Sequence, residues 1–112
     1  MWKDDDGTLV DIIRHFEEVK QFPILCPKCN TNSVHVYIHV YDKYKRGGSW
    51  IWCSKCRMYQ HSSVVYKRYW ENCPAVEPEK LCHAPDYLEG IRDEIDKHVN
   101  LVKSTEEHIE EV

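Results

Sequence analysis

Two Cys-x-x-Cys motifs constrain the fold of this chain more than any other feature of its sequence. They occupy residues 26–29 and 53–56, and 23 residues separate them. Each such turn presents two sulfur atoms from one tight loop, and two turns together supply the four soft ligands that a tetrahedral zinc ion requires. Because four thiolates leave no coordination position for water, the site is expected to be structural. The sequence therefore predicts one structural zinc ion held by four ligands, namely Cys26, Cys29, Cys53 and Cys56.

Two other uses of paired cysteines fit this chain less well. Disulfides are typical of secreted proteins, whereas residues 1–7 are acidic and polar rather than basic and then apolar, as in an export signal. A redox dithiol of the thioredoxin type has one pair between a strand and a helix, but here two pairs flank sequence of β type. The longest apolar stretches are a few residues, too short for a membrane span. We therefore expect a cytoplasmic protein.

The residues between the motifs predict β-strands. From Ser33 to Tyr41, valine and isoleucine alternate with histidine and tyrosine, which is the period of a strand with one buried face. Residues 49–53 and 58–66 are rich in aromatic and β-branched residues and predict two further strands.

Apolar residues at helical spacing predict one helix before the strands and one after them. The first covers residues 8–21, and the second lies in residues 86–112, from about 86 to 102, with an acidic tail. The proline-bearing segment 67–85 predicts a loop. We expect an α+β fold, a single domain over residues 1–112, in which a small three-stranded antiparallel zinc ribbon (24–66) is flanked by an N-terminal and a C-terminal amphipathic helix. The buried face of the second helix is expected to carry Leu88, Ile91, Ile95, Val99 and Val102.

The cysteine motifs and their surroundings resemble the zinc ribbon family over residues 24–66. The matching residues are Cys26-Pro-Lys-Cys29, and Trp52-Cys53-Ser-Lys-Cys56 with a strand after it. The longer run over residues 48–62, with residues 69–72 after it, is also similar to small bacterial proteins associated with toxin–immunity loci. The first resemblance implies a fold that serves many functions, and the second implies no functional residue.

Charge is distributed unevenly along the chain. Residues 1–25 carry three basic and six acidic side chains (−3), residues 26–70 carry eight basic and one acidic (+7), and residues 71–112 carry four basic and twelve acidic (−8). A basic centre between two acidic flanks is a clue to binding partners rather than to the fold.

The first functional hypothesis is a non-catalytic protein-binding module, in its most concrete form an immunity-type protein that neutralises a toxin by occlusion. An acidic surface suits a basic, nuclease-like target. The expected contact residues are Glu89, Asp93 and Asp96, or exposed side chains of Trp50 and Trp52. Tryptophan suits a core as well as an interface, and at least one of the two is expected to be core because both lie close to the second cysteine turn.

The alternative hypothesis is a zinc ribbon that binds nucleic acid through its basic segment, residues 26–70. Its expected phosphate contacts are Lys43, Lys45, Arg46, Lys55 and Arg57. The overall acidity, with a formal net charge of −4, counts against it. No catalytic motif and no small-molecule substrate site is evident, so we expect that the protein is not an enzyme.

Two further groups of residues leave alternatives open. The alternating rings His35, Tyr37, His39 and Tyr41 would offer a stacking platform for unpaired bases if exposed, but we favour a face that a helix covers. A second metal site would have to use Cys73 and Cys82 with His61 and His83. The spacing of these four residues matches no common ligand pattern.

Overall fold

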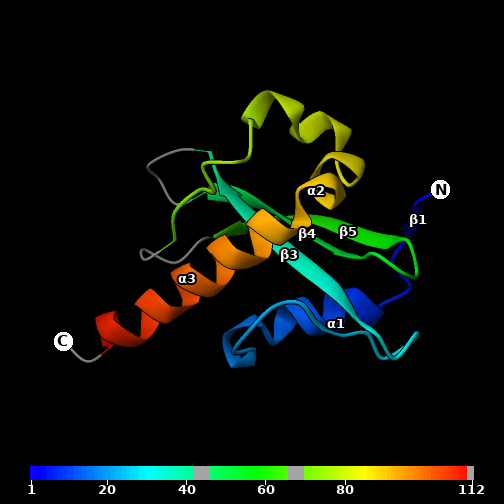
Figure 1. Cartoon of the computed structure of the whole chain (residues 1–112), viewed down its shortest axis with the longest axis horizontal. Helices are drawn as coiled ribbons and strands as arrows, with labels where there is room; N and C mark the ends of the chain where they lie inside the picture. The colour runs from blue at the N-terminus through cyan, green and yellow to red at the C-terminus, as the bar shows by residue number, and fades with distance from the viewer. Residues whose placement is uncertain (42–45, 66–69, 111–112) are drawn as a thin grey trace.

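The computed structural model describes residues 1–41, 46–65 and 70–110 (Figure 1). The strands are β1 (Lys3–Asp4), β2 (Ile24–Leu25), β3 (Asn32–Val40), β4 (Arg46–Cys53) and β5 (Met58–Val65). The helices are α1 (Thr8–Arg14), α2 (Asp86–Gly90) and α3 (Arg92–Glu110), with the short 3₁₀ helices η1 (Phe16–Glu18) and η2 (Pro78–His83). These elements make an α+β fold, the class expected from the sequence.

The described strands form one five-stranded mixed sheet, in the order β1-β5-β4-β3-β2, and not the three-stranded antiparallel ribbon that the sequence suggested. The three predicted strands are β3, β4 and β5, and they do pair antiparallel in the centre. β2 adds an antiparallel strand beside β3, and β1 adds a parallel strand beside β5. Each added strand has two residues, and so short a segment has no periodicity that a sequence pattern could detect.

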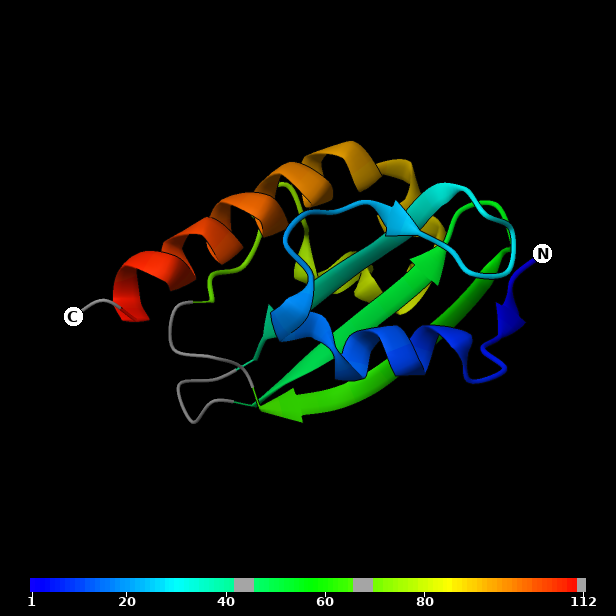
Figure 2. The same ribbon diagram turned by 90° about the horizontal axis from the view of Figure 1, so that it is seen from below.

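Both faces of the central strands are buried. The alternation of residues in β3 had predicted a strand with only one buried face. Val36 belongs to the face covered by α1, and the opposite face lies under α3 (Figure 2). His35, Tyr37 and His39 on that second face are 5% exposed or less, while Tyr41 beyond the strand is 59% exposed. The prediction that a helix covers the His/Tyr face is confirmed at His35, which contacts Asp96 of α3, whereas Tyr37 contacts Cys73 in the segment before η2. The three buried rings are not available as a stacking platform for bases.

The first helix is shorter than the predicted span of residues 8–21. α1 stops before His15, which has non-helical dihedral angles (φ −107°, ψ 24°), and η1 follows. At its other end, the carboxylate of Asp5 accepts hydrogen bonds from the backbone N–H groups of Leu9 and Val10, at 2.8 and 2.9 Å. One acidic residue of the N-terminal run thus satisfies the free N–H groups of the first helical turn.

The second predicted helix is divided into α2 and α3. Ile91 interrupts it with φ −120° and ψ 24°, directly after Gly90. The predicted apolar face is confirmed, because Ile91 is partly buried against the core and the other members are buried. Those buried members are Leu88, Ile95, Val99 and Val102.

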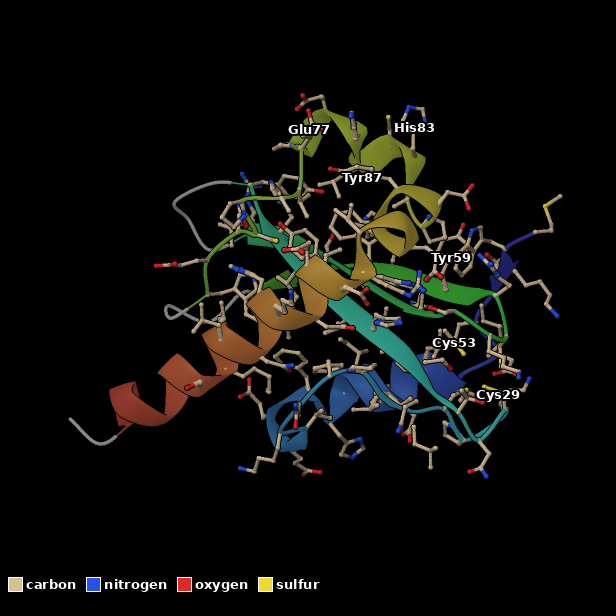
Figure 3. The ribbon with its side chains drawn as sticks, viewed as in Figure 1. Cys29, Cys53, Tyr59, Glu77, His83 and Tyr87 are labelled. Atoms are coloured by element: carbon tan, nitrogen blue, oxygen red, sulfur yellow. The ribbon has the colours of Figure 1, made fainter. Side chains whose placement is uncertain are left out.

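The predicted loop over residues 67–85 contains η2 in its described part. Tyr87 of α2 anchors the segment before η2. The Tyr87 hydroxyl accepts the N–H of Glu77 at 2.8 Å and donates to the carbonyl of Ala75 at 3.3 Å. Figure 3 shows Glu77 and Tyr87 at this side of the molecule.

Candidate metal centre

The four cysteines of the two motifs come together at one end of the sheet, where Figure 3 labels Cys29 and Cys53. Their sulfur atoms all lie within 4.8 Å of one another. The Sγ atoms of Cys26 and Cys56 are 3.8 Å apart, and those of Cys29 and Cys53 are 3.7 Å apart. Disulfide sulfurs would be about 2.05 Å apart. Four sulfurs about 2.3 Å from a tetrahedral zinc ion would be ~3.8 Å apart, so the arrangement has the dimensions of a metal site with four thiolate ligands.

The two cysteine turns have the same backbone geometry. In each turn the residue after the second cysteine has a positive φ, 55° at Asn30 and 61° at Arg57. The N–H of that residue donates to the carbonyl of the first cysteine, from Asn30 to Cys26 at 2.8 Å and from Arg57 to Cys53 at 2.9 Å. Left-handed geometry suits asparagine better than arginine. The positive φ at Arg57 was therefore not evident from the residue type.

The β3–β4 hairpin carries the second turn back to the first. Cys53, the last residue of β4, lies opposite Val34 near the start of β3. One residue further, the N–H of Ser54 donates to the carbonyl of Ser33 at 2.9 Å. Most of the 23 residues between the motifs thus belong to the paired strands β3 and β4.

The ionisation of the four thiols is unequal. Burial raises the pKa of Cys26, and burial together with hydrogen bonds to the other cysteines raises the pKa of Cys56 to about 12. Burial also opposes ionisation of Cys29, but hydrogen bonds with Ser33, Thr31 and the other cysteines together outweigh it and lower its pKa to about 6. Because the pKa values of Cys26 and Cys56 are raised, these thiols become thiolates only beside a cation. Metal binding would therefore release their protons.

The N-terminal segment packs around the cysteine turns, which the sequence did not suggest. Lys28 of the first turn forms an ion pair with Asp6. Arg57 of the second turn lies over the ring of Trp2, 4.9 Å from its centroid, and the Trp2 indole N–H bonds to Asp86 of the helical layer. The first residues of the chain thus join the site to α2.

The two tryptophans expected at an exposed contact surface are buried, and that expectation is wrong. Trp50 is 5% exposed and Trp52 is 0% exposed. Trp50 stacks on His61 with ring centroids 4.4 Å apart, and the Trp52 indole N–H donates to Glu89 at 3.0 Å. Both side chains fill the interface between the sheet and the helices because they belong to the face that the helices cover.

Two of the three expected acidic contacts are bound within the protein. The Glu89 carboxylate pairs with Arg92 at 3.2 Å, and its side chain is 14% exposed. Asp96 is buried, and both its carboxylate oxygens lie 2.9 Å from Nδ1 of His35. Asp93 is exposed. Sequence periodicity placed all three on one polar helix face, whereas contacts with the sheet and with Arg92 engage two of them.

The basic residues of the nucleic-acid alternative do not form a described patch. Lys43 and Lys45 lie outside the described residues. Arg46 and Lys55 are exposed, at opposite ends of β4, and Arg57 is held over an aromatic ring.

A second metal site is not assembled within the described ranges. There, the four cysteines of the two motifs are the only group of three or more histidine, cysteine or acidic side chains close enough to share an ion. Cys73 is buried, and its backbone N–H donates to the Tyr37 hydroxyl at 3.2 Å. Cys82 is exposed, and its thiol donates to the carbonyl of Glu79.

The comparisons with known proteins give no relative for this chain. No protein-family model, no curated protein and no solved structure matches it. In the part of the chain that the structure describes, the helices are too short or too polar to cross a lipid bilayer. The function must therefore be inferred from the site itself.

Proposed function

We propose that Cys26, Cys29, Cys53 and Cys56 bind one structural Zn²⁺ ion. The observation that carries this proposal is the clustering of the four sulfurs within 4.8 Å of one another, with two Sγ–Sγ distances, 3.8 and 3.7 Å, that match the edge of a zinc–thiolate tetrahedron. Tetrahedral sulfur ligation suits zinc or iron, and zinc needs no redox partner. All four ligands come from the protein, so the ion has no open position for a substrate, and its role is to hold the two turns together.

Metal analysis of the purified protein tests this assignment. We expect one zinc per chain in the wild type, and less than stoichiometric zinc in Cys29→Ser. Cys82→Ser is the matched control, because Cys82 is an exposed cysteine outside the site. A wild-type protein that binds no zinc, or a Cys82→Ser variant that loses it, would contradict the proposal.

We further propose that the zinc-stabilised fold is a non-catalytic protein-binding module, and specifically an immunity-type protein that neutralises a toxin by occlusion. The C-terminal part of the chain, residues 71–112, carries four basic and twelve acidic residues, a balance of −8. Asp93 and Glu94 remain exposed at the start of α3. A basic protein surface is the complement of this acidic helix face.

Affinity capture from the native cell tests the binding role. The tagged protein is used at moderate salt, with and without nuclease treatment. We expect a stoichiometric protein partner that persists after nuclease treatment and is lost when Asp93 and Glu94 are both changed to lysine. Recovery of nucleic acid, with partners that nuclease removes, would favour the nucleic-acid alternative instead. Retention of the partner by the double variant would exclude this helix face as the contact.

A further inference from the structure

An open pocket of about 490 Å³ lies beside the cysteine cluster. Its walls come from the start of β3, the second cysteine turn and the junction of α2 with α3. Ser33 belongs to the lining, and its Oγ atom lies 3.0 Å from Sγ of Cys53. Ser33 therefore lies between the pocket and the metal site. None of the four cysteines is among the residues that line the pocket.

His35 lines this pocket and keeps one ring nitrogen without a partner among the described residues. Nδ1 faces the two carboxylate oxygens of Asp96, so it is the nitrogen that donates there, and in the neutral tautomer with this proton Nε2 is an acceptor. The ring stacks on Trp52 at 5.5 Å, and His35 is 4% exposed, so packing fixes its orientation. Buried polar atoms nearly always have a partner, and His35 is part of the pocket lining, so an occupant of the pocket can supply the donor for Nε2.

The charges at the pocket favour a cationic occupant. The lining contains Glu89, Asp93 and Asp96 against two basic residues, Lys55 and Arg92. Glu89 is already paired with Arg92. A hydrogen bond from a neutral imidazole does not cancel the charge of Asp96, so Asp93 and Asp96 together exceed Lys55 by one formal charge. Asp93 is exposed, lies one helical turn from Asp96 and has no ion-pair partner among the described residues. A zinc ion with four thiolates adds a net charge of about −2 beside the pocket.

We propose that this pocket binds the guanidinium group of an arginine side chain presented by a partner protein. The guanidinium donates one N–H to Nε2 of His35 and pairs with the carboxylate of Asp93. Arginine is enriched among the anchor residues of protein interfaces because its fixed donors fit acceptors of this kind. This inference rests on the proposed protein-binding function and names its point of contact.

The test is an NMR titration of the zinc-loaded full-length chain with N-acetyl-arginine methylamide, an arginine side chain without a partner protein. The ¹⁵N signal of His35 Nε2 and the backbone amides are followed. We expect a saturable shift at Nε2, with a dissociation constant on the order of millimolar for so small a ligand. The uncharged norleucine analogue should give no such shift. Equal shifts with both analogues, or shifts confined to other surfaces, would overturn the proposal.

A matched pair of variants assigns the ionic contact. Asp93→Asn should weaken binding of the arginine analogue roughly threefold or more, the loss of one partly exposed ion pair. Asp11→Asn should leave it unchanged, because Asp11 is an exposed acidic residue of α1 that does not line the pocket. Asp93→Asn with wild-type affinity would contradict the assigned contact. Tighter binding of putrescine than of the arginine analogue would contradict a partner's arginine as the source of the cation.

This experiment separates the pocket from the wider function. The titration contains no partner, so its result does not depend on whether a partner is captured from cells. A captured partner that Asp93→Asn retains, and that only the double lysine variant releases, would preserve the protein-binding proposal and overturn the pocket as its contact.

Discussion

The two ends of β3 are stabilised in different ways. Where β3 begins, sulfur atoms from two turns converge within 4.8 Å of one another. Where β3 ends, aromatic rings and buried hydrogen bonds join the N-terminal segment to α3. We call these regions the metal end, residues 26–33 and 53–57, and the clasp, which consists of Phe16, Phe22, Trp70, Asn100 and Lys103.

The clasp depends on packing and needs no ion. Phe16 contacts the ring of Phe22, with centroids 5.8 Å apart, and that of Trp70, with centroids 5.9 Å apart. The ammonium group of Lys103 lies 3.8 Å from the Phe16 ring centroid and donates to the Phe16 carbonyl at 2.8 Å. The Trp70 indole N–H donates to the carbonyl of Ile38 at 2.7 Å. We expect a core of this kind to form from the chain alone, and the metal end to need the proposed zinc ion to offset the cost of gathering four thiols.

The largest expected effect is the loss of the metal end in Cys26→Ser. Zinc contributes about 10–16 kcal/mol to small zinc-finger peptides, so this change should lower the unfolding free energy more than any of the substitutions that follow. Thermal unfolding followed by circular dichroism measures the loss, with Cys82→Ser as the control. Equal melting temperatures for the two variants would mean that the metal end needs no metal.

Trp70→Ala should damage the clasp while the metal site stays loaded. Removal of a buried tryptophan side chain costs about 3–5 kcal/mol, and Trp70 is 5% exposed. We expect a lower midpoint in denaturant titration together with one zinc per chain. Loss of zinc from this variant at low denaturant would show that the two ends are not separable.

Asn100→Ala tests the polar part of the clasp. The Asn100 amide accepts the N–H of Phe22 at 2.7 Å and donates to its carbonyl at 2.9 Å. Leaving these partly buried backbone groups unpaired should cost about 1–3 kcal/mol. Chemical denaturation measures it against Lys97→Ala, because the Lys97 side chain is 78% exposed on the same helix. Similar stabilities of the two variants would contradict the role of Asn100.

The smallest expected effect lies in the backbone of the metal end. Asn30 has φ 55°, and an alanine there should cost about 1–2 kcal/mol, since alanine disfavours this region and lacks the short polar side chain with which asparagine tolerates it. Asn30→Gly should be close to neutral because glycine adopts positive φ freely. Gln21→Ala, at an exposed position whose φ is not positive, is the control. Denaturant midpoints measure all three, and a destabilised glycine variant would exclude backbone strain as the cause.

The metal end was largely predictable from the sequence, because spacing alone fixes which cysteines can meet. The central strands were also predictable from local sequence. Their residues alternate between apolar and polar or have high β-propensity. The edge strands were not, because Lys3–Asp4 and Ile24–Leu25 pair through contacts that two-residue segments do not reveal in their own sequence.

The clasp and the pocket were missed because both depend on tertiary contacts. Periodicity marked Asp96 as part of a polar helix face, yet its partner His35 is 61 residues away in sequence. Trp52 likewise fitted either a core or an interface, and only the position of α2 decides between them. No local sequence pattern reveals that a polar residue of a helix will contact a buried histidine of a strand, as Asp96 contacts His35.

Amide hydrogen exchange of the zinc-loaded and chelator-treated protein tests the central claim most directly. That claim is that zinc holds the metal end while packing holds the clasp. We predict that chelation accelerates exchange at the amides of Asn30 and Arg57, which close the two cysteine turns, and leaves the Phe22 amide protected. Unchanged protection at Asn30 and Arg57, or equal loss of protection at all three amides, would contradict it.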